Sequence, residues 1–115
     1  MKVDLSPRAR VELGEILEYY AAQQSGLDVE FLTEFEFSSR QLGQFPEIGS
    51  VAGGLMTSVR RSRRLIMRRF PYLLIYTLAQ DSVTIVAIAH QSRRPGSWRN
   101  RVEEAAPTYA VGLAA

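Results

Sequence analysis

Two closely spaced apolar runs, residues 72–78 and 83–89, constrain this chain more than any other feature. Their β-branched, aliphatic and aromatic residues favour strands, and the four-residue link 79–82 favours a hairpin turn. The apolar side chains occupy both alternating faces: Leu73 and Ile75 against Leu74 and Leu78, then Val83, Ile85 and Ala87 against Val86 and Ile88. A strand that is apolar on both faces needs a cover on each face. We therefore expect this hairpin to be buried on both sides.

Helical periodicity precedes these strands. Lys2–Leu5 alternates polar and apolar residues, which predicts a short edge strand, and Ser6 followed by Pro7 is typical of a helix start. Apolar residues then recur every three or four positions, which predicts an amphipathic helix of about 17 residues that Gly26 ends. These positions are Leu13, Ile16, Leu17 and Tyr20.

A second helix has the same period and is predicted to end at Pro46, with Phe31, Phe35, Ser38, Leu42 and Phe45 on its apolar face. Because the link between the two helices is short, we expect an antiparallel helical hairpin. The aromatic residues of this hairpin are expected to lie in the core: Tyr19, Tyr20, Phe31, Phe35 and Phe45.

Residues 47–57 are rich in glycine and predict a loop, after which the period changes to two. Residues 59–69 predict a strand with Arg61, Arg63, Leu65 and Met67 on one face and Arg60, Arg64, Ile66 and Arg68 on the other. The predicted order is β-α-α-β-β-β, an α+β fold with a small, mostly antiparallel sheet packed on an N-terminal helical hairpin. One helix pair covers one face, so residues 96–115, a loop or another protein must cover the second. We expect a single domain over residues 1–104 and a C-terminal tail at 105–115.

The composition argues against several kinds of site. The chain has no cysteine, which excludes disulfides and thiolate metal ligands, and its single histidine, His90, does not favour an all-protein transition-metal site. No cofactor or metal is therefore expected. No apolar run approaches the roughly 20 residues of a membrane-spanning helix, and no signal peptide is visible, so we expect a cytoplasmic protein.

Positive charge is concentrated in the second half of the chain. Residues 1–55 carry four basic residues and nine carboxylates, a sum of −5, whereas residues 56–115 carry ten arginines and three carboxylates, a sum of +7. Thirteen of the fourteen cations are arginine, whose guanidinium binds phosphate or carboxylate bidentately and stacks on bases. This division indicates one face built for a polyanion or for an acidic partner.

Several segments resemble members of the RelE/ParE toxin superfamily. Residues 9–20 (ARVELGEILEYY) are similar to its first helix, and the helix with Phe31, Phe35 and Leu42 that ends at Phe45-Pro46 is similar to its second. Residues 68–76 (RRFPYLLIY) also resemble the family, and residues 87–101 (AIAHQSRRPGSWRNR) resemble the signature that follows the last strand of many ParE-like members. The order and spacing of these motifs carry the resemblance over about residues 3–101.

The resemblance implies the toxin of a bacterial type II toxin–antitoxin pair, a plasmid stabilisation protein that inhibits growth. In such pairs a cognate antitoxin, encoded by a neighbouring gene, wraps an extended and often acidic segment around the toxin, and the pair forms a hetero-oligomer. An uncovered apolar sheet face would suit such a partner. The arginines would suit an acidic one.

Two activities share this fold, so the fold alone does not choose between them. RelE-like members cleave mRNA at the ribosome, which requires cations converging on one phosphate and a group that moves protons. The candidates for that chemistry are Arg61, Arg64, Arg68, His90, Arg93 and Arg94. Histidine is the side-chain type that titrates near neutral pH, but a histidine at the end of a strand is also a common structural residue.

ParE-like members lack a nuclease constellation and inhibit DNA gyrase by binding. Residues 90–101 resemble this branch more closely, and the chain has no lysine after Lys2, whereas nuclease members commonly place lysines among their catalytic cations. Arginine does not replace lysine as an ordinary acid or base, because its pKa stays above about 12. A binding-type toxin is therefore the preferred interpretation, and an mRNA endonuclease is the alternative. A non-toxic RNA-binding module, with Tyr72 and Tyr76 stacking on bases, is a third hypothesis.

Two surfaces are predicted for these partners. Arginine and tryptophan are enriched at interface hot spots, so the target-binding candidates are Arg93, Arg94, Trp98, Arg99 and Arg101. A structural interpretation is also open, in which Trp98 closes the core and the arginines pair with Glu103, Glu104 or the acidic first helix. The antitoxin-binding candidates are Arg60, Arg61, Arg64, Tyr72, Leu74 and Tyr76. The arginines at 60–64 also suit an edge strand that resists aggregation.

Overall fold

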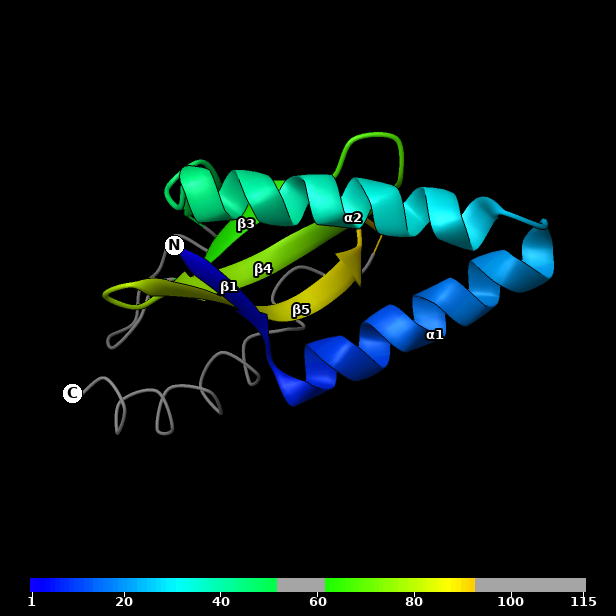
Figure 1. The fold of residues 1–115 in the computed structure, drawn as a ribbon, viewed down its shortest axis with the longest axis horizontal. Helices are drawn as coiled ribbons and strands as arrows, with labels where there is room; N and C mark the ends of the chain where they lie inside the picture. Colours follow the sequence, from blue (N-terminus) through cyan, green and yellow to red (C-terminus); the bar gives the residue numbers. More distant parts are fainter. Residues whose placement is uncertain (52–61, 93–115) are drawn as a thin grey trace.

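The computed structural model describes residues 1–51 and 62–92. Its elements are β1 (Lys2–Leu5), α1 (Pro7–Gln23), α2 (Leu27–Gln44), β2 (Ser50–Val51), β3 (Arg63–Ile66), β4 (Tyr72–Leu78) and β5 (Ser82–His90). The predicted α+β fold is confirmed: a helical hairpin precedes a mostly antiparallel sheet, as Figure 1 shows. One element was not expected, because the two-residue strand β2 lies inside the predicted loop 47–57.

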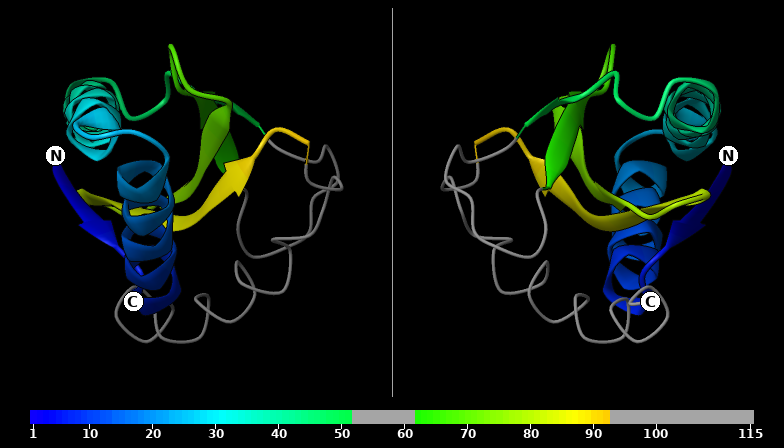
Figure 2. Two further views of the ribbon diagram at one scale, coloured as in Figure 1. Left: turned by 90° about the vertical axis from the view of Figure 1, so that its right-hand side faces the viewer. Right: turned by 90° about the vertical axis from the view of Figure 1, so that its left-hand side faces the viewer.

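The strands form one sheet in the order β1-β5-β4-β3-β2. β1 pairs in parallel with β5, with Val3 opposite Val83 and Leu5 opposite Ile85, whereas every other neighbouring pair is antiparallel. The first strand of the chain is therefore an edge strand, as predicted, and it lies beside the last described one. Figure 2 shows both helices on the same side of this curved sheet.

The helix boundaries follow the predicted signals. The hydroxyl of Ser6 accepts a hydrogen bond of 3.1 Å from the amide of Ala9, and Pro7 is the first helical residue. Gly26 adopts a φ of 89°, in the left-handed region that favours glycine, and connects the two helices as the N-cap of α2. From this turn the helices diverge across the sheet (Figure 1).

The core between helices and sheet has an aromatic cluster at one end. Tyr20 of α1 and Phe31 of α2 stack at 5.6 Å between ring centroids, and both meet Phe70 and Tyr72 edge-on. Two aromatic residues predicted for the core are instead exposed: Tyr19 by 56% and Phe45 by 60%. Tyr19 precedes Tyr20 and so points about 100° away around the helix axis. Phe45 lies past the last residue of α2, where the helical period no longer sets its direction.

A bulge in β5 changes which of its side chains face the helices. Ile75 pairs with Ala87 but Tyr76 pairs with Ile85, so Val86 has no partner in β4. Strict alternation would place Ala87 on the same sheet face as Ile85, and Ile88 on the same face as Val86. Instead Ile88 joins the core below the helices, together with Val83 and Ile85, so the predicted alternation is correct through Val86 and wrong for Ala87 and Ile88.

The second face of the sheet is apolar, as predicted, and its central side chains are buried. They form a cluster of their own that contains no helix residue: Leu73, Ile75, Val86, Ala87 and Ala89. This sheet face is therefore not bare at its centre. The predicted cover at 96–115 lies outside the described residues. At the β3 margin of this sheet face, Ile66 is 62% exposed and Arg64 is also exposed.

Candidate functional site

The predicted site residues divide into two groups. The structure describes Arg64, Arg68, Tyr72, Leu74, Tyr76 and His90. The others lie outside the described residues: Arg60, Arg61, Arg93, Arg94, Trp98, Arg99 and Arg101.

Arg68 belongs to an ion-pair cluster and not to a continuous strand. β3 ends at Ile66, so Arg68 does not continue the Arg64 face as predicted but reaches α2. Its Nε donates a hydrogen bond of 2.7 Å to Oε1 of Glu34, and its guanidinium lies 3.7 Å above the ring centre of Phe37. Arg69, at a φ of 71°, donates to Oε2 of Glu34 at 3.2 Å and to Glu30 at 3.1 Å.

Glu34 is the buried centre of this cluster, because it is only 4% exposed on the face of α2 that packs into the fold. Hydrogen bonds from Arg68, reinforced by Arg69, lower the pKa of Glu34 against the opposing effect of burial. Glu34 is not among the residues predicted for the site. A signal was present, because Glu34 occupies the apolar stripe of α2 between Phe31 and Ser38, where a carboxylate needs a cationic partner.

His90 ends β5 and lies opposite Tyr72 of β4, with 5.1 Å between the ring centres. Its Nδ1 accepts a hydrogen bond of 3.1 Å from the amide of Ser92 and lies 2.8 Å from the Ser92 hydroxyl. The imidazole thus closes the first turn after the strand. This contact is the structural role that a histidine at a strand end commonly has.

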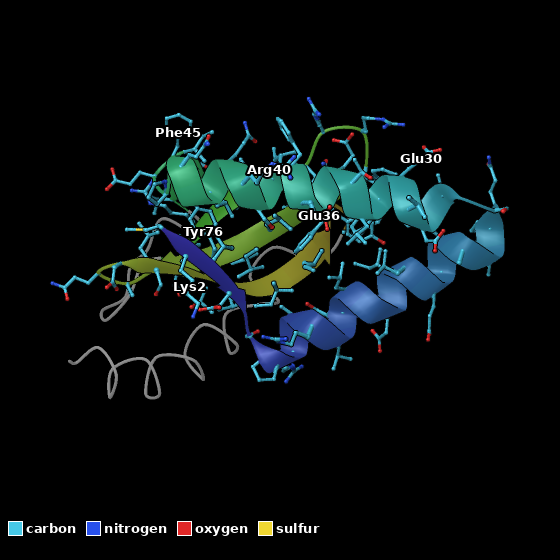
Figure 3. All side chains as sticks on the ribbon, viewed as in Figure 1. Lys2, Glu30, Glu36, Arg40, Phe45 and Tyr76 are labelled. Atoms are coloured by element: carbon cyan, nitrogen blue, oxygen red, sulfur yellow. The ribbon has the colours of Figure 1, made fainter. Side chains whose placement is uncertain are left out.

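Two of the antitoxin-binding candidates have no exposed surface. Leu74 and Tyr76 are both 0% exposed and belong to the core below the helices. The Tyr76 hydroxyl accepts from the amide of Gly49 and donates to the carbonyl of Pro46, each at 2.9 Å. Burial raises the pKa of Tyr76. Figure 3 labels this tyrosine near Phe45, at the end of the molecule where α2 stops.

The described members of the nuclease set do not converge on one point. Arg64 pairs with Ile75 and so lies on the sheet face away from the helices, whereas His90 pairs with Tyr72 on the helix-covered face. Arg68 is bound to Glu34 of α2. Among residues 1–51 and 62–92, no group of three or more His, Cys, Asp or Glu side chains is placed to hold a metal ion. No helix in these ranges is long and apolar enough to span a membrane.

Comparisons with known proteins agree with the fold. A solved structure described as the chromosomal ParDE TA system from P. aeruginosa superposes with a TM-score of 0.62 at 16% identity, covering 78% of this chain and 95% of that chain. A search of curated proteins finds no match. The family model for the ParE toxin of the type II toxin–antitoxin system parDE matches residues 3–95. Because that match covers most of the chain, the chain belongs to the ParE toxin family of type II toxin–antitoxin systems.

Proposed function

We propose that this ParE-family toxin inhibits growth by binding a macromolecular target, with DNA gyrase as the target by analogy, and that a cognate antitoxin from a neighbouring gene neutralises it. The observation that carries the proposal is the family match over residues 3–95, together with the failure of the described nuclease candidates to converge. Phosphodiester cleavage needs its cations and its proton-transfer group at one phosphate. Binding has no such requirement.

The target-binding surface is assigned to Arg93, Arg94, Trp98, Arg99 and Arg101, which directly follow the last described turn. Guanidinium and indole groups supply large contact areas and charge-assisted hydrogen bonds, which is why they recur at interface hot spots.

The antitoxin surface keeps Arg64 from its described candidates, together with Arg60 and Arg61, whereas Tyr72 lies on the opposite, helix-covered face against Tyr20 and Phe31. Arg64 is exposed beside Ile66 on the same sheet face, so an acidic and partly apolar segment would find both a cation and an aliphatic contact there. Leu74 and Tyr76 are left out, since fully buried side chains have no surface to offer a partner.

The test is induced expression with and without the neighbouring short reading frame, with mRNA integrity and plasmid supercoiling read separately. Relaxed or broken DNA with intact mRNA, and rescue by the neighbouring gene, are the expected results. Rapid mRNA cutting at ribosomes would instead support the endonuclease alternative.

Variants then test the target surface. We expect Arg94→Ala and Trp98→Ala to reduce toxicity while the circular dichroism spectrum is retained. Gln91→Ala is the matched control, since Gln91 is exposed in the same segment and it is its backbone amide that donates to the carbonyl of Pro71. Loss of solubility in both variants would make Arg94 and Trp98 core residues.

A further inference from the structure

Arg68 and Arg69 form a pair of surface cations that one carboxylate holds from beneath. The Glu34 side chain is 6% exposed, whereas the side chains of Arg68 and Arg69 are 60% and 56% exposed. Each guanidinium donates to a different oxygen of Glu34, at 2.7 and 3.2 Å. The buried carboxylate therefore occupies the inner side of both guanidinium groups, and their outer sides face away from the fold.

The backbone between β3 and β4 brings these neighbouring arginines to the same side of the chain. In an extended chain, adjacent side chains point to opposite sides. Arg69 instead has a φ of 71°, a left-handed conformation that is unfavourable for residues other than glycine. In this turn, which Figure 1 shows beside α2, both side chains reach Glu34. Backbone strain of this kind is often retained where it places side chains for a function.

The guanidinium of Arg68 has a fixed orientation and still has donors for a ligand. It lies 3.7 Å above the ring centre of Phe37, which sets the plane of the group. Its contact with Glu34 uses Nε, so its two Nη groups can donate side by side to an oxyanion. A side chain that is already held in place loses little conformational entropy when it binds a ligand.

The charges of the cluster favour a polyanion over a single carboxylate. Two arginines against one buried carboxylate leave one positive charge, which Glu30 balances from the surface at 3.1 Å from Arg69. Glu30, which Figure 3 labels on α2, is 49% exposed, and exposed ion pairs contribute little stability. Another carboxylate would only replace Glu30 by its equivalent. Successive phosphates of a nucleic-acid strand would give acceptors to both arginines at once.

We propose that Arg68 and Arg69 bind the phosphate backbone of a nucleic-acid strand, which displaces Glu30 from Arg69. This inference goes beyond the proposed inhibition of a macromolecular target and does not depend on it. It concerns binding and not cleavage. Because phosphate contacts position a strand without reading its bases, little sequence preference is expected.

The experiment measures the fluorescence anisotropy of a labelled single-stranded DNA of about 12 nucleotides with the full chain, over a series of salt concentrations. Arg68→Gln should weaken binding about tenfold. It should also reduce the slope of log K against log salt concentration by about 0.7, the value for one phosphate contact on a single strand. A merely structural role of the cluster would not change this slope. Glu30→Gln should strengthen binding, because it removes the competing carboxylate.

Two variants on the exposed surface of α1 control for net charge. Gln23→Glu lowers the net charge by one, as Arg68→Gln does. Glu15→Gln raises it by one, as Glu30→Gln does. Equal effects within either pair, or an unchanged salt slope in Arg68→Gln, would overturn the assignment.

Two further measurements complete the test. Circular dichroism checks the fold of each variant, and if Arg68→Gln fails to fold, the comparison of Glu30→Gln with Glu15→Gln decides. Polyglutamate is added as a competitor against unlabelled DNA of the same length. Displacement of the labelled strand by polyglutamate as readily as by DNA would overturn the proposal in favour of an acidic polypeptide. In each of these outcomes the proposed function is left standing, because toxicity is not the readout.

Discussion

Glu34 of α2 accepts a 2.7 Å hydrogen bond from Arg68 and a 3.2 Å hydrogen bond from Arg69 on its two carboxylate oxygens. Two guanidinium groups on one largely buried carboxylate attach the turn between β3 and β4 to the second helix. Two arginines of the basic half therefore form ion pairs within the fold, although their side chains stay 60% and 56% exposed.

Glu34→Gln should destabilise the fold, because the amide keeps one acceptor oxygen but leaves Arg68 without its counter-charge and Arg69 with Glu30 alone. A lower melting temperature is the expected result, measured by circular dichroism at pH 7. Glu30→Gln is the control, because Glu30 is exposed and Arg69 is its ion-pair partner within the described part of the chain, so its loss should be small. An unchanged melting temperature in Glu34→Gln would show that the cluster does not hold the turn.

The same carboxylate predicts a pH dependence. Because the pKa of Glu34 is lowered in the folded state, its stabilising contribution is present above the ordinary value of 4.5 and is lost as the pH falls through the folded value. Urea denaturation between pH 7 and pH 3 should show a smaller acid loss of stability in Glu34→Gln than in the wild type. Parallel curves for the two proteins would contradict this assignment.

The sequence predicts most of the element order because its signals are local. Ser6, Pro7 and Gly26 act within one turn of the helices that they begin or connect, and the run of aliphatic, β-branched and aromatic residues identifies β4 directly. The bulge at Val86 could not be predicted from the sequence, because it depends on how β5 pairs with both β1 and β4. The pairing of Arg68 with Glu34 was missed because it joins residues 34 positions apart.

The loop after α2 is predicted to depend on Tyr76. Tyr76→Phe removes both the acceptor for the Gly49 amide and the donor to the Pro46 carbonyl, so the free energy of unfolding should fall by about 1–3 kcal/mol. Because burial raises the pKa of Tyr76, wild-type stability should also fall as the pH rises above 10.0, and Tyr76→Phe should show less of that alkaline loss. Urea denaturation at pH 7 and pH 10.5 measures both effects.

Gly49→Ala tests the same contact from the other side. An added Cβ would come 2.7 Å from the Tyr76 hydroxyl and also collide with the Arg64 carbonyl, so a loss of about 1–3 kcal/mol is expected from overpacking. Gly14→Ala is the matched control, because nothing lies within 4 Å of its Cβ position. In the middle of α1 this change should stabilise the fold by about 0.5–1 kcal/mol. Equal effects of the two changes would contradict the tight approach at Gly49.

The side chain of Glu12 accepts a backbone hydrogen bond from β5 beyond the end of its pairing with β1. Its Oε1 accepts a hydrogen bond of 3.0 Å from the amide of Ile88, a residue that is 2% exposed. Glu12→Ala leaves that buried amide without an acceptor and should cost about 1–3 kcal/mol, whereas Glu12→Gln keeps an oxygen in place and should cost less. Urea denaturation of the wild type and both variants measures the three free energies of unfolding, and the expected order is wild type, Glu12→Gln, Glu12→Ala. Equal losses in both variants would contradict the prediction.

Substitutions of His90 distinguish a toxin that acts by binding from one that cleaves mRNA. If the imidazole only accepts the hydrogen bond from Ser92, His90→Asn should retain toxicity, because the asparagine oxygen can accept from the same amide. His90→Ala should then lower toxicity only as far as the loss of this hydrogen bond disturbs the turn. If the imidazole transfers protons at a phosphate, both variants should lose about 10²–10⁴-fold in rate, since neither side chain titrates. Dose-matched growth inhibition by the wild type and both variants decides between these roles. We expect asparagine to preserve inhibition, and equal, severe losses in both variants would favour mRNA cleavage.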